Sequence, residues 1–201
     1  MGDATVTDEL RERILGELSP EVGMIANKQL ATQVVEAWAM AIAASSMDCI
    51  SDMKASGNPD TAPISAGTQA EHLRGVARAA VGLADALTAV FPDLKVNRDV
   101  VVAGGLCHDL GKAWEFDPEN QKRWKADPRA VGFPSVRHPP YGVHAALSAG
   151  LPEAIVHIAG AHSGEGELVV RSLECTIVHS ADYAFWDALK AGGMLDEGRA
   201  R

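Results

Sequence analysis

The sequence predicts an all-α fold, and three observations lead to this expectation. Apolar residues recur at helical spacing in one segment after another, as Leu10, Ile14 and Leu18 do near the start of the chain. Residues that favour helix starts precede several of these segments, and Thr68 with Glu71 has the spacing of a capping box. Glycine or proline follows several others and would end the helix there.

The composition limits both the size of the fold and the class of partner. With 201 residues, of which 47% are hydrophobic, the chain can bury one sizeable core, so we expect one domain with an appendage. The net charge of −9 argues against a sequence-independent grip on nucleic acid or anionic lipid, because neutralising phosphates requires clustered Lys and Arg. We therefore expect a small anionic substrate, with neither nucleic acid nor membrane as a partner.

The cysteines and the N-terminal residues indicate in which cellular compartment the protein is expected. Cys49, Cys107 and Cys175 are isolated and lack a Cys-x-x-Cys spacing, so we expect neither a disulfide framework nor a thiolate zinc site. The N-terminus is polar and acidic, and the longest apolar stretch is interrupted by Glu36 and Asp48. These observations predict a cytoplasmic protein without a signal peptide or membrane span.

The N-terminal part is expected to form two helices, over residues 7–18 and 20–54. Val34, Trp38 and Ile42 belong to an apolar stripe of the second helix, which packs either inside this chain or against a second subunit in a homodimer. Turn-forming residues follow it, and they predict a linker. We expect three parts: an N-terminal helical extension (residues 1–60), a main domain (61–192) and a frayed polar tail (193–201).

Two further helices are predicted at the start of the main domain. The first runs from the capping box to about residue 91 and carries His72 on its apolar face. The second starts at Asn97, a favourable N-cap residue. Gly104 and Gly105 lie inside this second helix, where each costs roughly 1 kcal/mol relative to alanine. They therefore indicate close approach by another helix, and we expect this to be the helix that bears His72.

The second of these helices ends in His108 and Asp109, and this ending could hold a metal ion. Imidazole nitrogen and carboxylate oxygen bind first-row divalent metals, and the negative end of the helix dipole favours a cation there. Gly111 is expected to end the helix in a left-handed conformation. Lys112 would then lie near the mouth of the site.

Residues 113–137 are expected to form one long irregular stretch that is rich in aromatic and basic residues, Arg137 among them. Such loops in compact domains are usually functional or disordered, and the aromatic content argues against disorder. We interpret the stretch as a lid or substrate-binding loop that offers cations to an anionic group, although a plain surface loop remains the alternative.

The remaining histidines lie on later predicted helices, and all seven fall between positions 72 and 179. His138 stands just before a proline-started helix that carries His144, and His162 lies on the inward face of a helix that begins at Pro152. The last helix, about 168–189, places Asp182 on an apolar stripe one turn after His179. An inward carboxylate needs a partner, which is either a salt bridge or a metal.

The order of these residues resembles the HD-domain superfamily of metal-dependent phosphohydrolases over about residues 68–190. The specific part of the resemblance is His-Asp-Leu-Gly-Lys at 108–112 together with Ala181-Asp182, and His138 stands in a His-Pro-x-x-Gly context. The resemblance implies an HD-domain helical bundle with two divalent metal ions. It assigns one ion to His72, His108, Asp109 and Asp182, and the second to His138 and His162, with Asp109 bridging.

The resemblance also implies roles around the metal site. Asp109 and Lys112 are the predicted catalytic residues, and Lys112, Arg137 and Tyr141 are predicted to contact the substrate. His144 is an alternative to His138 as a ligand or supports the site, and His179 is expected to support it. Oxygen and nitrogen ligands without cysteine fit Fe, Mn, Mg or Zn.

These residues predict a metal-dependent hydrolase that cleaves a small phosphorylated substrate, a nucleotide or another phosphoester, with a metal-activated hydroxide. Three alternatives stay open. The superfamily includes di-iron oxygenases that cleave a C–C or C–P bond with the same ligands, but those relatives have a tyrosine shortly before the first ligand. His-Pro-x-x-Gly also marks cyclic-dinucleotide hydrolases, but their Gly-Tyr-Pro element is missing after His162. The last alternative is a non-catalytic, metal-bound sensor or scaffold.

Overall fold

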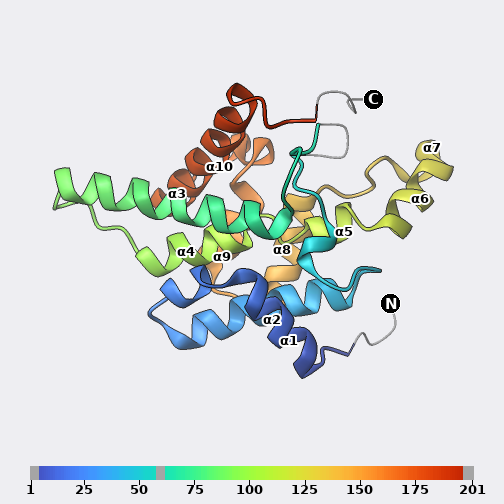
Figure 1. The fold of residues 1–201 in the computed structure, drawn as a ribbon, viewed down its shortest axis with the longest axis horizontal. Helices are drawn as coiled ribbons and strands as arrows, with labels where there is room; N and C mark the ends of the chain where they lie inside the picture. Colours follow the sequence, from blue (N-terminus) through green and yellow to red (C-terminus); the bar gives the residue numbers. More distant parts are fainter. Residues whose placement is uncertain (1–4, 58–61, 197–201) are drawn as a thin grey trace.

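The structure, a computed structural model, describes residues 5–57 and 62–196 of the chain. Within these ranges it is helical, with one isolated antiparallel bridge between Ile64 and Leu195, and the predicted all-α class is confirmed. The elements, shown in Figure 1, are α1 (Asp8–Leu18), η1 (Glu21–Met24), α2 (Lys28–Ala43), η2 (Ile50–Asp52), α3 (Gln69–Val90), α4 (Arg98–Cys107), α5 (Lys112–Glu115), α6 (Pro118–Ala126), α7 (Pro128–Val131), α8 (His138–Ser148), α9 (Glu153–Ala161), η3 (Gly164–Leu168) and α10 (Leu173–Ala191).

The long helix α3 runs through the middle of the molecule. In Figure 1, α10 lies on one side of it and α4 on the other, and α9 packs against α4. The capping box predicted at its start is present: the Thr68 side chain and the Glu71 side chain each bond the other's backbone N–H. Asn97 caps α4 as predicted, accepting a hydrogen bond from the backbone N–H of Val100. These caps fix where the two central helices begin.

Gly104 and Gly105 allow the close helix packing that the sequence indicated. A Cβ at Gly105 would lie 2.7 Å from the Cα of Ala77, on the helix that carries His72. A Cβ at Gly104 would lie 2.4 Å from the Cδ1 of Ile158 on α9, so this glycine serves a different neighbour. Helix α4 is thereby held tightly between α3 and α9.

The N-terminal helices share a hydrophobic core with the rest of the chain. Val34, Trp38 and Ile42 are fully or almost fully buried, and the Trp38 indole N–H donates to the carbonyl oxygen of Leu106 at 2.8 Å. The apolar stripe of α2 is therefore used inside this chain. The predicted boundary between residues 60 and 61 lies outside the described residues and stays a prediction.

The predicted single helix over residues 20–54 is wrong. Asn27 caps α2 through its side chain, and the helix ends at Ala43. The Asp52 carboxylate then accepts hydrogen bonds from the backbone N–H groups of Asp48 and Cys49, which favours a turn over a continued helix. Hydrogen bonds that the side chains of Asn27 and Asp52 accept from nearby backbone N–H groups thus interrupt the helix, although the apolar spacing continues through the segment.

Three other expectations about the backbone are corrected. Residues 113–137 contain α5, α6 and α7, and Asp117 and Asp127 cap the last two, so the stretch is not irregular. The last helix begins at Leu173 after η3. The start of the predicted frayed tail, up to residue 196, pairs with residues 63–65 through backbone hydrogen bonds; residues 197–201 lie outside the described part.

Candidate metal centre

The six predicted ligand residues meet at one buried place. They come from α3, α4 and the residues that follow it, α8, the end of α9, and α10, so five separate segments converge there. Each is at most 7% exposed. The set is His72, His108, Asp109, His138, His162 and Asp182.

Asp109 lies at the centre, and its two carboxylate oxygens face different histidines. Its Oδ2 is 3.2 Å from Nε2 of His72 and 3.3 Å from Nε2 of His108. Its Oδ1 is 3.3 Å from Nε2 of His138 and 3.5 Å from Nε2 of His162. A single carboxylate therefore joins two sets of imidazoles.

Asp182 completes the set around His72 and His108. Its Oδ1 is 3.3 Å from Nε2 of His72 and 3.8 Å from Nε2 of His108. The two imidazole Nε2 atoms are themselves only 3.2 Å apart. Three groups of ligand atoms each lie within 4.8 Å of one another: His72, His108 and Asp109; His108, His162 and Asp182; and Asp109, His138 and His162.

Backbone and side-chain partners orient three of the imidazole rings. Nδ1 of His108 lies 2.8 Å from the carbonyl oxygen of Gly105, and Nδ1 of His162 lies 3.1 Å from that of Ala159. Nδ1 of His138 lies 2.5 Å from Oε2 of Glu115. Each acceptor requires a proton on Nδ1, so in the neutral ring Nε2 keeps its lone pair and points it at the centre.

The donor set fits a metal ion. Asp182 Oδ1 is buried without a hydrogen-bond partner among the described residues, although it faces the imidazoles. Burial lowers the pKa of His108, but the carboxylates of Asp109 and Asp182 outweigh burial and raise it above the ordinary value. Burial would raise the pKa of Asp109, but Lys112 and His108 bring it well below its usual range. The centre thus gathers lone pairs and negative charge, which a divalent cation would neutralise.

Lys112 is more buried than the sequence suggested. It is 3% exposed, and its ammonium donates to Asp109 Oδ2 at 2.7 Å and to the carbonyl oxygen of Ser56 at 2.5 Å. It still lines the pocket described below. The predicted left-handed stop at Gly111 is wrong, because its φ is −73°. Glycine is needed there for space, since a Cβ would lie 2.0 Å from the carbonyl oxygen of His138.

A pocket of about 400 Å³ leads to this centre. Asp109, His138, His162 and Asp182 reach it, whereas His72 and His108 do not line it. Other residues of its wall are Gly57, Lys112, Arg137, Ser163, Gly164, Glu165, Tyr183, Trp186 and Asp187.

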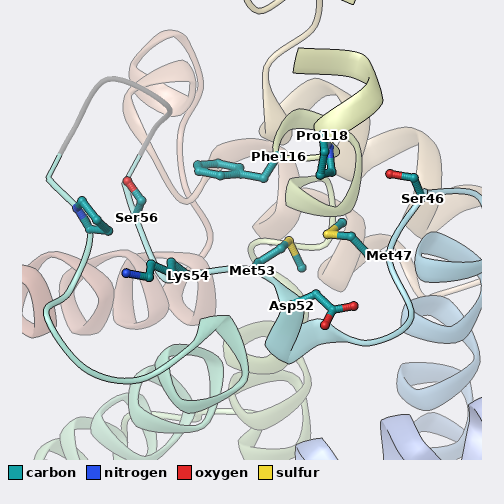
Figure 2. A pocket seen from close by; sticks show the side chains of 9 residues that line it. Ser46, Met47, Asp52, Met53, Lys54, Ser56, Phe116 and Pro118 are labelled. Atoms are coloured by element: carbon teal, nitrogen blue, oxygen red, sulfur yellow. The ribbon is translucent and has the colours of Figure 1, made fainter. Parts of the chain in front are cut away.

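A second pocket, of about 430 Å³, has Ser56 in its wall but not Lys112. Figure 2 shows it, with Phe116 and Pro118 above Met47 and Met53 in this view. None of the predicted site residues is among its described lining residues. The two pockets are similar in volume, and the chemistry of the one with the histidines and carboxylates indicates a site.

The predicted substrate-contacting and supporting residues have different positions. Arg137 lines the metal pocket, and its guanidinium donates to Glu115 at 2.5 Å and to Glu165 at 3.0 Å. Tyr141 does not line the pocket. Its ring stacks on Trp114 instead, with centroids 4.7 Å apart.

The two supporting histidines also differ. His144 is exposed and its ring faces Tyr141, so the structure brings His138 and not His144 to the centre. Nδ1 of His179 lies 2.5 Å from the backbone carbonyl oxygen of His162, at the edge of the centre.

Sequence reasoning missed four residues that touch the predicted ligands, and one of them is Phe185, whose ring lies against His72 with centroids 4.9 Å apart. The Gln69 side-chain amide donates to Asp109 Oδ2 at 2.7 Å, and Glu115 bonds His138. The Trp186 ring lies against His72, with centroids 5.0 Å apart. Helical spacing could have indicated two of them: Gln69 precedes His72 by three residues, and Trp186 follows Asp182 by four.

Comparison with protein families agrees with this geometry. The model of the HD domain matches residues 70–185, more than half of the chain. The chain belongs to the HD-domain family. Members of this family are mostly metal-dependent hydrolases, and the predicted resemblance is confirmed at the level of the family. Comparisons with curated proteins and with solved structures give no match.

Within residues 5–57 and 62–196, no helix is both long and apolar enough to span a membrane. All three cysteines are free, as expected from their isolation in the sequence.

Proposed function

We propose that this HD domain hydrolyses a small phosphorylated compound, a nucleotide or another phosphoester, at two divalent metal ions. The observation that carries the proposal is the placement of Asp109, whose two oxygens face His72 with His108 on one side and His138 with His162 on the other. A carboxylate in this position suits a bridge between two ions. The site would take Fe, Mn, Mg or Zn, because its donors are oxygen and nitrogen.

The six residues would hold the ions, with His72, His108 and Asp182 on one side of Asp109 and His138 and His162 on the other. When bound, such ions supply hydroxide near neutral pH and neutralise the oxygens of a phosphate under attack. The chain itself supplies the pocket, the cations on its wall and the orientation of each ligand ring.

Lys112 would bind a phosphate oxygen. Two of its three N–H groups are used by Asp109 and Ser56, which fixes the ammonium beside the centre and leaves one donor for the substrate. Arg137 would bind the substrate further along the pocket wall. Two of its five N–H donors are used by the carboxylates of Glu165 and Glu115, which leaves three for the substrate. We do not include Tyr141, because its ring lies away from the pocket.

A panel of phosphoesters tests the proposal, assayed with each of the four metals in turn. We expect turnover by the wild-type protein and none by Asp109→Ala or the isosteric Asp109→Asn. Asp85→Asn is a matched control, because it makes the same acid-to-amide change at an exposed carboxylate outside the centre. Unchanged turnover in both Asp109 variants would remove this residue from the mechanism and the proposal with it.

Two further measurements on the same protein, of oxygen consumption and of bound metal, separate the alternatives. Iron-dependent oxygen consumption without phosphoester turnover would favour the oxygenase interpretation, which uses the same six ligands. Bound metal without any turnover would favour a sensor or scaffold.

A further inference from the structure

Glu115 lies outside the predicted ligand set, yet it is fully buried beside that set. We propose that Glu115 is a positioning residue that sets His138 for the second metal ion and thereby controls whether this ion binds. This inference rests on the two-ion site of the proposed function. It assigns a role to a residue of the stretch that was expected to be a substrate-binding loop.

Glu115 fixes both the ring and the backbone of His138. Its Oε2 lies 2.5 Å from Nδ1 of the imidazole and accepts a hydrogen bond from the backbone N–H of the same residue at 2.9 Å. With the ring held at Nδ1, Nε2 points at Asp109 Oδ1, 3.3 Å away. Without Glu115, the orientation of this ring has no comparable anchor among the described contacts.

The support of His138 differs from that of the other ligands. His108 and His162 rest on neutral backbone carbonyls, which belong to their own helices and need no other residue to place them. His138 rests on a carboxylate from a different helix, α5, which follows the His-Asp pair directly. A carboxylate that accepts the other N–H of a metal-ligating imidazole makes the ring a stronger base towards the metal. Loss of such a partner typically weakens metal binding about 10- to 100-fold.

The second oxygen of Glu115 ties the metal ligand to the pocket wall. Oε1 accepts a hydrogen bond from Arg137 at 2.5 Å, and the guanidinium also bonds Glu165 at 3.0 Å. Arg137 supplies the positive charge that a buried carboxylate requires. Glu115 is therefore a common anchor for a metal ligand and for a cation that lines the substrate pocket.

Metal counting on the whole chain tests this role. The wild-type protein, Glu115→Gln and the matched control Glu165→Gln would be titrated with Mn²⁺, and bound ions would be measured by calorimetry and elemental analysis. Glu165→Gln removes the outer partner of Arg137 and leaves the contact between Glu115 and His138 intact. We expect two ions in the wild type and in the control. In Glu115→Gln we expect the first ion to bind as before and the second about 10- to 100-fold more weakly.

The outcomes separate this inference from the proposed function. Two ions in the wild type, with both bound equally well by Glu115→Gln, would overturn the role of Glu115 and leave the two-ion site intact. Loss of both ions in Glu115→Gln would also overturn it, because the effect would then not be specific to His138. A wild-type protein that binds one ion would refute the two-ion site itself. His138→Gln provides the reference for loss of the second ion alone.

Discussion

The two halves of the candidate metal centre are built differently. His72 and His108 lie behind the pocket, on the long helix α3 and at the end of α4, and do not reach its surface. His138 and His162 line the pocket, at the start of the shorter helix α8 and the end of α9. The inner half thus lies within the packed core, and the outer half faces the pocket.

The residues that hold His72 differ in kind from those that hold His138. On the inner side, the Phe185 and Trp186 rings pack against His72, and a Cβ at Gly75 would lie 2.6 Å from the Phe185 ring. On the outer side, one carboxylate and one close backbone approach, at Gly111, place His138. We expect the outer half to fail in variants that leave the inner half unchanged.

The largest effect is expected at the residue that the two halves share. Asp109→Asn should abolish binding of both ions, because each carboxylate oxygen serves one half, and the change replaces one oxygen by an amide NH2 group and removes the negative charge from the other. Losing several kcal/mol of transition-state stabilisation would lower kcat/KM roughly a thousand-fold or more. Metal content and phosphoester turnover of the variant and of Asp85→Asn check this, and an Asp109→Asn protein that keeps both ions would contradict it.

The next largest effects are expected in variants that each change one half of the centre. His138→Gln should remove the outer ion and keep the inner one, whereas His72→Gln should weaken the inner ion and also disturb the packing of Phe185 and Trp186. The midpoint of thermal unfolding of the metal-free protein should therefore fall more in His72→Gln than in His138→Gln. Calorimetric titration and melting curves provide the measurements. Equal loss of both ions in both variants would argue against two separable halves.

Gly111→Ala should damage the outer half through the backbone. Its Cβ would lie 2.0 Å from the carbonyl oxygen of His138, and overpacking of this kind costs about 1–3 kcal/mol or more. Gly82→Ala is the matched control: it lies inside α3 with nothing within 4 Å of its Cβ, and it should stabilise the protein by roughly 1 kcal/mol. Denaturant unfolding measures both, and a Gly111→Ala protein as stable as the wild type would show that the backbone there moves freely.

The smallest effect is expected at Glu165 in the pocket wall, and it concerns the stability of the protein at acidic pH. Burial raises the pKa of Glu165, but hydrogen bonds from Ser163 and Arg137 outweigh it and bring the pKa to about 2. Because the folded-state pKa is depressed, its contribution to stability is present above the ordinary value of 4.5 and is lost as the pH falls towards 2. In Glu165→Gln, the free energy of unfolding should therefore decrease less than in the wild type as the pH falls from 4.5 to 2. Unfolding free energies across this range test it, and an unchanged acid limb would contradict it.

The sequence was sufficient to predict which six residues converge at the centre but not which residues support them. Asp109, His138 and His162 were predicted as ligands because their residue types, positions at helix ends and motif context are local features. Glu115 was missed because its role depends on which helix lies opposite, which no local pattern encodes, whereas the spacing of Gln69 from His72 on one helix was a local signal that was not used. The helix over residues 20–54 was overextended for a related reason, since the apolar spacing continues across the turn that Asp52 stabilises.

The central claim is that one carboxylate joins two metal positions. Anomalous X-ray diffraction from crystals of the protein soaked in Mn²⁺ tests it most directly. We predict two peaks, one beside the Nε2 atoms of His72 and His108 and the other beside those of His138 and His162, with Asp109 between them. The absence of peaks at the centre, or a single peak that Asp109 does not contact, would contradict the account.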